Sequence, residues 1–159
     1  MVTHSMKSEL VLVKASDFYH FMTNLPSEIY AHWLREEHYE ARVIKEGKNK
    51  PLGNLIYFDQ NIGKKYRMKF HAIIRTANRP TKIVYQMRKF GISLPGYLEL
   101  EFADTPNGLL LKEHIRIGFN GLGKVLDPFI RIVYNKHFFK EMDAHHKREW
   151  ECLAEILKK

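Results

Sequence analysis

The sequence predicts an α+β protein in which a curved antiparallel sheet of about seven strands packs against one long C-terminal helix, with two short helices after the first strand. Two observations support this prediction. Apolar and polar residues alternate with a period of two in several short segments through the middle of the chain. Beyond residue 126, apolar residues recur instead at steps of three and four, which is the period of a helix.

The size and composition of the chain predict its domain count and compartment. With 159 residues, 45% of them hydrophobic, the chain is long enough for one domain with a substantial core and too short for two. We expect one domain over residues 1–159. Cys152 is the only cysteine, so no internal disulfide can form. Neither a signal peptide nor an apolar run of about 18 residues is present, which predicts a cytoplasmic protein.

The formal net charge of +8 raises the question of a nucleic-acid or anionic membrane partner. Lys and Arg residues are scattered over almost every predicted element, and no basic run reaches the length of an interaction tail. We interpret this charge as a solvated basic surface. The sequence therefore predicts neither nucleic acid nor a membrane as a partner.

The first part of the chain predicts three strands and the two short helices. Ser16-Asp17 and Pro26-Ser27-Glu28 each have the residues that begin a helix. Residues Gly47 to Pro51 read as a turn. The predicted strands are Ser8–Lys14, Tyr39–Lys45 and Leu52–Phe58.

The middle of the chain has the clearest strand pattern. Apolar residues alternate with basic residues and a histidine from Tyr66 to Arg75, and similar alternation follows in three more segments, near residues 82–88, 97–102 and 109–117. In the last of these, Glu113 shares a face with apolar residues. Large apolar side chains on the inward face suit either a filled core or an apolar pocket. The candidate cavity residues are Met68, Phe70, Tyr85, Met87 and Phe102.

The predicted C-terminal helix runs from Leu126 to Leu157, because no Gly or Pro interrupts the apolar stripe after Pro128. His145 and Glu149 fall on that stripe at spacing i, i+4, where apolar residues are expected. Such a pair is either an ordinary ion pair on a solvated face or two ligands of one metal ion. Burial without a partner would be costly for both side chains. A similar pair, His137 with Glu141, is interpreted as solvated.

The order of these elements resembles the helix-grip fold of the START-like superfamily, which is also the fold of the polyketide cyclases and birch-pollen allergens. In those proteins a curved sheet wraps around the C-terminal helix and encloses a cavity.

Two further segments could supply metal ligands. Read alone, His38 also fits a surface histidine, and the polar residues from Asp59 to Gly63 also fit an ordinary strand end.

Three segments taken together resemble the diacetylphloroglucinol hydrolases and relatives such as phloretin hydrolase. Members of that family have a Trp-His-Pro-x-Asp-His segment, an acidic residue just before Ile-Gly, and a C-terminal His-His-x-x-Glu helix ending near Asn-Leu. Two departures stand out: a glutamine replaces the acidic residue, and Leu34-Arg35 replace His-Pro. The matching residues are Trp33 with His38, Gln60 with Ile62-Gly63, and His145-His146 with Glu149 and Leu153.

This resemblance implies a zinc-dependent hydrolase that cleaves a carbon–carbon bond between an acyl group and an aromatic ring, that is, a hydrolase acting on C–C bonds in ketonic substances. The implied zinc ligands are His38, His145 and Glu149, with Gln60 at the position of a second glutamate. With a neutral glutamine there, the site is expected to bind zinc more weakly, unless Asp59 or Glu113 supplies the missing carboxylate. An inward-facing Glu113 or Tyr57 is expected to transfer protons.

An alternative prediction comes from the cavity alone. The same fold suits a carrier or sensor that binds a hydrophobic or aromatic small molecule without chemistry, and an aromatic content of 13% fits a cavity of this kind. Zinc binding separates the two predictions, because a carrier does not need the metal.

Overall fold

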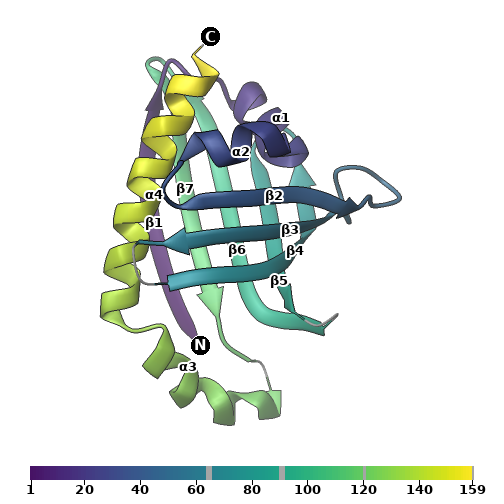
Figure 1. Cartoon of the computed structure of the whole chain (residues 1–159), viewed down its shortest axis with the longest axis vertical. Helices are drawn as coiled ribbons and strands as arrows, with labels where there is room; N and C mark the ends of the chain where they lie inside the picture. The colour runs from purple at the N-terminus through teal and green to yellow at the C-terminus, as the bar shows by residue number, and fades with distance from the viewer. Residues whose placement is uncertain (64–65, 90–91, 120, 159) are drawn as a thin grey trace.

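The computed structural model describes residues 1–63, 66–89, 92–119 and 121–158, and in these ranges one seven-stranded antiparallel sheet has the order β1-β7-β6-β5-β4-β3-β2 (Figure 1). The strands are β1 (Val2–Val11), β2 (His38–Lys45), β3 (Leu55–Ile62), β4 (Tyr66–Asn78), β5 (Lys82–Lys89), β6 (Ile92–Thr105) and β7 (Gly108–Ile117). The helices are α1 (Ala15–Asn24), α2 (Ser27–Trp33), the 3-10 turn η1 (Gly121–Leu126), α3 (Asp127–Val133) and α4 (Lys136–Leu157).

The curved sheet and the C-terminal helix pack together as the sequence predicts. Helix α4 runs along the sheet, and α1 and α2 cover one end of it (Figure 1). Trp150 and Leu153 of α4 belong to the same buried core as Ile56, Leu100 and Leu111 of the sheet. Burying the apolar face of an antiparallel sheet under one amphipathic helix leaves the other face for solvent. The predicted α+β helix-grip fold class is confirmed.

Two strands differ in extent from the prediction. β1 begins at Val2 rather than Ser8, and it pairs with β7 from Val2 opposite Ile117 to Val11 opposite Gly108. Hydrogen bonds along the whole of β7 satisfy the backbone groups of β1. The side chains at the start of β1 alternate too weakly between apolar and polar residues to predict a strand there. β3 runs from Leu55 to Ile62, so it begins three residues after the start of the predicted segment Leu52–Phe58 and ends four residues after its end. The polar residues after Phe58 are therefore part of the strand.

The prediction of one continuous helix from Leu126 to Leu157 is wrong. The chain forms η1 and α3 first, leaves the helical conformation at Tyr134 and Asn135, and begins α4 at Lys136. The side-chain oxygen of Asn135 accepts hydrogen bonds from the main-chain N–H groups of His137 at 3.0 Å and Phe138 at 3.1 Å. Asparagine is a strong helix N-cap, so a polar residue makes the break without any Gly or Pro.

Replacing this cap is expected to destabilise the fold. Asn135→Ala leaves two N–H groups at the start of α4 without their acceptor and should lower the free energy of unfolding by about 1 kcal/mol. Urea unfolding followed by circular dichroism measures the change. Lys140→Ala, on the exposed side of the same helix, is the matched control and should change stability by less than about 0.5 kcal/mol. Equal losses in the two variants would contradict the capping role.

Candidate functional site

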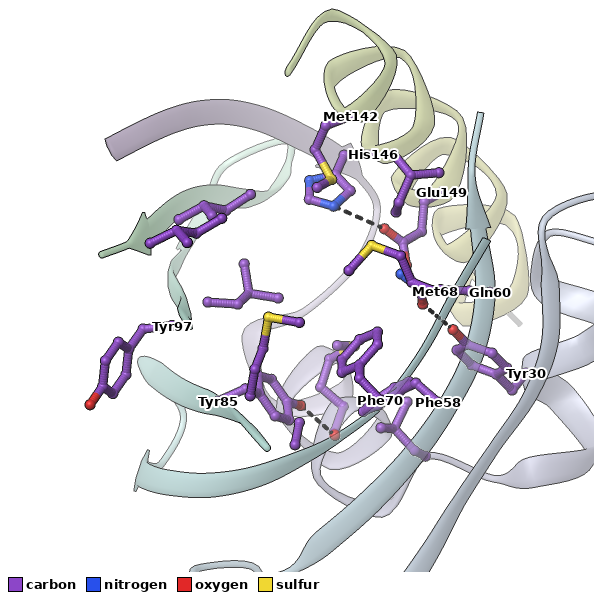
Figure 2. Close-up of a pocket in the computed structure, with 18 of the residues that line it drawn as sticks. Tyr30, Phe58, Gln60, Met68, Phe70, Tyr85, Tyr97, Met142, His146 and Glu149 are labelled. Carbon is purple, nitrogen blue, oxygen red and sulfur yellow. Dashed lines mark hydrogen bonds and ion pairs between the residues drawn. The ribbon is translucent and has the colours of Figure 1, made fainter. Parts of the chain in front are cut away.

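An apolar cavity of about 120 Å³ lies between the sheet and α4 (Figure 2). Four of the five predicted cavity residues, Met68, Phe70, Tyr85 and Met87, line it. Phe102 does not. Its ring packs edge-on against Phe18 with centroids 4.9 Å apart in the core beneath α1, so the prediction is wrong for this residue. The inward face of the sheet is divided between a cavity and a filled core.

Three buried side chains that could hold a metal ion converge beside the cavity, and of these only Glu149 lines it. His38 begins β2, whereas His145 and Glu149 lie one turn apart on α4, and one ligand atom from each lies within 4.8 Å of the others. The Nε2 atom of His38 is 3.4 Å from Oε1 of Glu149, and Nε2 of His145 is 3.8 Å from Oε2. The i, i+4 pair is thus a buried cluster rather than a solvated ion pair.

Aromatic residues of α2 hold His38 in this position. The Tyr30 ring stacks on the imidazole with centroids 4.3 Å apart and an interplanar angle of 4°. The Trp33 ring lies edge-on to it, and its indole N–H donates a 2.6 Å hydrogen bond to the main-chain carbonyl oxygen of Glu149. Since Trp33 and His38 are close in sequence, this bond ties the start of β2 to α4 next to the cluster.

A second carboxylate orients His145. Glu37 accepts hydrogen bonds from Nδ1 of His145, from the Arg148 guanidinium and, at 3.3 Å, from the N–H of Gly63. Burial alone would raise the pKa of Glu37, but the bonds from His145 and Arg148 lower it below its ordinary value. Because an ionised carboxylate only accepts, Nδ1 carries the proton and Nε2 presents a lone pair to the cluster. This carboxylate–histidine arrangement is typical of metal ligands.

The protonation states also fit a metal ion. Burial lowers the pKa of His145, so its ring is neutral at neutral pH. Burial would raise the pKa of Glu149, but contact with His38 and the nearby imidazoles lowers it to about 2, so the carboxylate stays charged. Both Nε2 atoms, of His38 and of His145, face the Glu149 carboxylate without a well-formed hydrogen bond in the part of the chain that the structure describes. Two imidazole nitrogens and one carboxylate are a donor set that zinc uses in catalytic sites.

Gln60 reaches the cavity beside this cluster. It lies on β3 opposite His38 of β2, and its side chain lies near that of Glu149 (Figure 2). Its side-chain oxygen accepts a 2.5 Å hydrogen bond from the Tyr30 hydroxyl. The Gln60 side chain therefore lines the cavity, and its oxygen already accepts a hydrogen bond from Tyr30.

Asp59 and Tyr57 lie on the other face of the sheet. Asp59 makes ion pairs with Arg67 at 3.0 Å and Lys69 at 3.2 Å, and the Tyr57 ring lies against His71. Neither lines the cavity. The predictions that Asp59 supplies a metal-binding carboxylate and that Tyr57 faces inward are therefore wrong.

Glu113 faces inward as predicted, but it contacts a different histidine. It lies 2.7 Å from Nδ1 of His146 and accepts a hydrogen bond from the Trp150 indole N–H. Burial would lower the pKa of His146, but attraction to Glu113 raises it to about 9, so the imidazole is protonated at neutral pH. Nε2 of His146 lies 4.0 Å from Glu149 and the ring lines the cavity (Figure 2). Glu113 therefore holds His146 and is not one of the three clustered donors.

Two important residues of the site, Glu37 and His146, were not predicted. Glu37 directly precedes His38, at the position of the Asp in the family's Trp-His-Pro-x-Asp-His segment. His146 lies three residues before Glu149, so it shares a helix face with that residue. Both signals are present in the sequence, but only the packing of β7 against α4 shows that Glu113 and His146 pair.

Comparison with known proteins supports the fold and no finer assignment. No family model matches the chain, and no curated protein matches its sequence. A START superfamily protein from Mycobacterium smegmatis has a similar structure, with a TM-score of 0.65, 13% identity, and coverage of 98% of this chain and 97% of that one. Ginseng major latex-like protein 151 from Panax ginseng has a TM-score of 0.58 and 10% identity, covering 91% and 97%. At these identities the likeness shows a shared helix-grip fold.

Removing Glu113 is expected to destabilise the protein strongly. Glu113→Ala leaves the His146 imidazolium buried without its counter-ion, which should lower the free energy of unfolding by about 3–5 kcal/mol. Urea unfolding measures the change. Glu101→Ala, which removes a carboxylate paired with Lys82 on the outer face, is the control and should cost at most about 1 kcal/mol. A loss below about 1 kcal/mol for Glu113→Ala would contradict a buried ion pair.

Proposed function

We propose that this protein binds a hydrophobic, aromatic small molecule in the cavity between the sheet and α4. The observation that carries the proposal is the cavity itself: an apolar chamber with His146, Glu149 and Gln60 on its wall. Mostly apolar pockets with a few convergent polar groups are the usual form of small-molecule sites.

The lining residues indicate the chemistry of the ligand. Met68 and Met87 are flexible and polarisable, and Phe70 and Tyr85 offer ring faces, so the middle of the cavity suits a flat aromatic body. Gln60 and His146 can hydrogen-bond a hydroxyl or carbonyl substituent. A phenol or an aryl ketone combines both features. The fold likeness to a START superfamily protein supports this proposal.

Filling the cavity should abolish ligand binding. Leu98 lines the cavity, and Leu98→Trp adds an indole where the ligand would lie. Titration with the small neutral fluorophore 2-naphthol, itself a phenol, should show saturable binding to the unchanged chain and at least about tenfold weaker binding to the variant, because the indole occupies the site.

The matched control is Leu52→Trp, at a leucine that is 41% exposed on a turn. It should bind the fluorophore as the unchanged chain does. Circular dichroism and a thermal melt verify that both variants fold. Equal affinity in the two variants would place the ligand elsewhere and contradict the proposal.

We further propose that His38, His145 and Glu149 hold one zinc ion beside this cavity. The lone pair that Glu37 directs from His145 and the charge of Glu149 support this assignment. Bound zinc would supply a Lewis acid and could lower the pKa of a bound water toward about 7. Glu37 would fix the ring of His145, and Trp33 would fix the backbone at Glu149.

The second candidate function is hydrolysis of an aryl–acyl carbon–carbon bond. The observation that favours it is the position of the three donors beside a cavity that suits an aryl ketone. Zinc with three protein ligands and an open position is the catalytic pattern. Gln60 separates this chain from the related hydrolases, because its amide brings no negative charge. Hydrolysis thus depends on the metal, whereas ligand binding does not.

Zinc binding should depend on the buried pair and not on its exposed counterpart. His145→Ala removes a ligand and should weaken zinc binding by at least about 100-fold, and Glu37→Gln, which disturbs the orientation of His145, by about 10–100-fold. Competition with a chromophoric chelator measures affinity, and the visible absorption of Co²⁺ reports the ligands. His137→Ala is the matched control, because His137 and Glu141 repeat the same spacing on α4 with His137 exposed.

Gln60→Glu tests the departure from the related hydrolases. A second carboxylate next to the cluster should tighten zinc binding on the order of tenfold. If the unchanged chain binds zinc no better than the His145→Ala variant, the metal site and the hydrolase candidate both fail. The small-molecule proposal would then stand on the fluorophore titration alone.

A further inference from the structure

A cluster of exposed apolar side chains covers η1 and α3. Among the described residues, thirteen large hydrophobic side chains are exposed, and six of them lie within twelve consecutive positions of this segment. The other seven are scattered between Met1 and Leu52. The apolar patch consists of Leu122, Val125, Leu126, Phe129, Ile132 and Val133. Contiguous apolar surface of this kind marks an interaction site.

The segment that carries the patch is fixed to the rest of the protein. Asp127 accepts a hydrogen bond from the N–H of Phe119 at 3.1 Å and pairs with the N-terminal ammonium of Met1. On the opposite side of α3 from the exposed residues, Ile130 packs against the buried cluster that includes Phe138 and Met142. Figure 1 shows α3 and the turns before it at the end of the molecule next to the N-terminus. The patch is therefore a supported outward face.

The charges around the patch are of one sign. Between Gly121 and Lys140 the four cationic residues Lys124, Arg131, Lys136 and Lys140 are all exposed. The only carboxylate in that range, Asp127, is buried and already paired. A short segment with apolar side chains, flanking cations and no exposed anion has the composition of an interfacial membrane-binding element.

A second copy of the chain fits this face less well. In a two-fold dimer this patch would meet the same patch of the other copy, and Lys124 and Arg131 would find no exposed carboxylate of this segment opposite them, because Asp127 is buried and paired. An anionic lipid surface instead offers a charge opposite to all four cations and an apolar layer for the side chains between them. None of the helices in the described ranges is long and apolar enough to cross a bilayer. The segment of η1 and α3 can contact a bilayer from one side.

We propose that η1 and α3 dock this protein on the surface of an anionic lipid bilayer, with the apolar patch entering the interface and Lys124 and Arg131 contacting lipid headgroups. This docking does not depend on a ligand in the cavity or on a metal ion. Tyr134, the residue directly after α3, lines the cavity, so the docked face adjoins the proposed ligand site. The surface would thus place the cavity next to a source of apolar molecules.

Vesicle sedimentation with the full chain tests the proposal. Vesicles of phosphatidylcholine and phosphatidylglycerol in about equal parts should bind the protein at least about tenfold more tightly than vesicles of phosphatidylcholine alone, because Lys124 and Arg131 contact the headgroups in the proposed docking. Raising the salt concentration should weaken binding to the anionic vesicles, since screening shortens the reach of these charges.

Variants separate the patch from the overall positive charge. The double variant Phe129→Glu with Ile132→Glu should lose at least about tenfold in affinity for the anionic vesicles. Ile44→Glu, at an exposed isoleucine on β2, introduces a like charge away from the patch and should lose much less. Thermal melts verify folding, and Lys124→Gln with Arg131→Gln provides a second, milder pair.

Three outcomes would overturn the proposal. They are no binding to anionic vesicles, equal losses for the patch variant and Ile44→Glu, or a dimer of the unchanged chain in analytical ultracentrifugation that the patch variant dissociates. Failure of fluorophore or zinc binding leaves vesicle binding unaffected, so the two proposals fail separately.

Discussion

The buried carboxylate of Glu149 is the constraint around which the other parts of this site are arranged. An ionised group removed from water costs several kcal/mol unless partners replace its hydration. Here three imidazoles surround it: His38 from β2, and His145 and His146 from α4. Two of these need partners in turn, and Glu37 and Glu113 supply them. The alternation of carboxylate and imidazole fixes α4 against β2 and β7, so the same contacts set both the packing of the helix and the geometry of the three clustered donors.

The repeating elements of the fold could be predicted from the sequence because hydrophobic periodicity reports burial directly. The strands of the middle of the chain form at the predicted places, although β6 runs from Ile92 to Thr105 and is longer than the predicted segment near residues 97–102. Periodicity failed where another contact decides the structure. β1 is held by its ladder with β7, and the break before α4 is made by the Asn135 side chain, which the apolar stripe passes over without a gap. Phe102 faces inward as predicted, but it packs against Phe18 of α1 in the filled core and does not line the cavity. The position of α1 decides which inward residues lie in that core.

For the candidate site, the sequence could place His145 and Glu149 by helical spacing and His38 by resemblance to a motif. The alternation of side chains along β3 indicates which of its residues share a face. Side chains alternate along a strand, so an inward Gln60 requires Tyr57 and Asp59 to face outward, as they do. No sequence pattern could show that Gly63 donates its N–H to Glu37, or that Glu113 pairs with His146. Those contacts join residues that are far apart in the sequence and that come together only in the folded protein.

The wrongly predicted helix and the apolar patch have one physical origin. In a continuous helix from Leu126, the residues Ile130 and Val133 would continue the buried stripe of α4. Because Asn135 begins a new helix, α3 follows its own direction: Ile130 remains packed, while Phe129, Ile132 and Val133 face outward. Neither the hydropathy of the sequence nor its basic runs indicate this patch. The apolar side chains are exposed only because the helix breaks at Asn135. Cavity-lining residues run from Tyr134, directly after α3, along α4 from Phe138 to Glu149 at the cluster. The two candidate sites therefore lie toward opposite ends of one cavity.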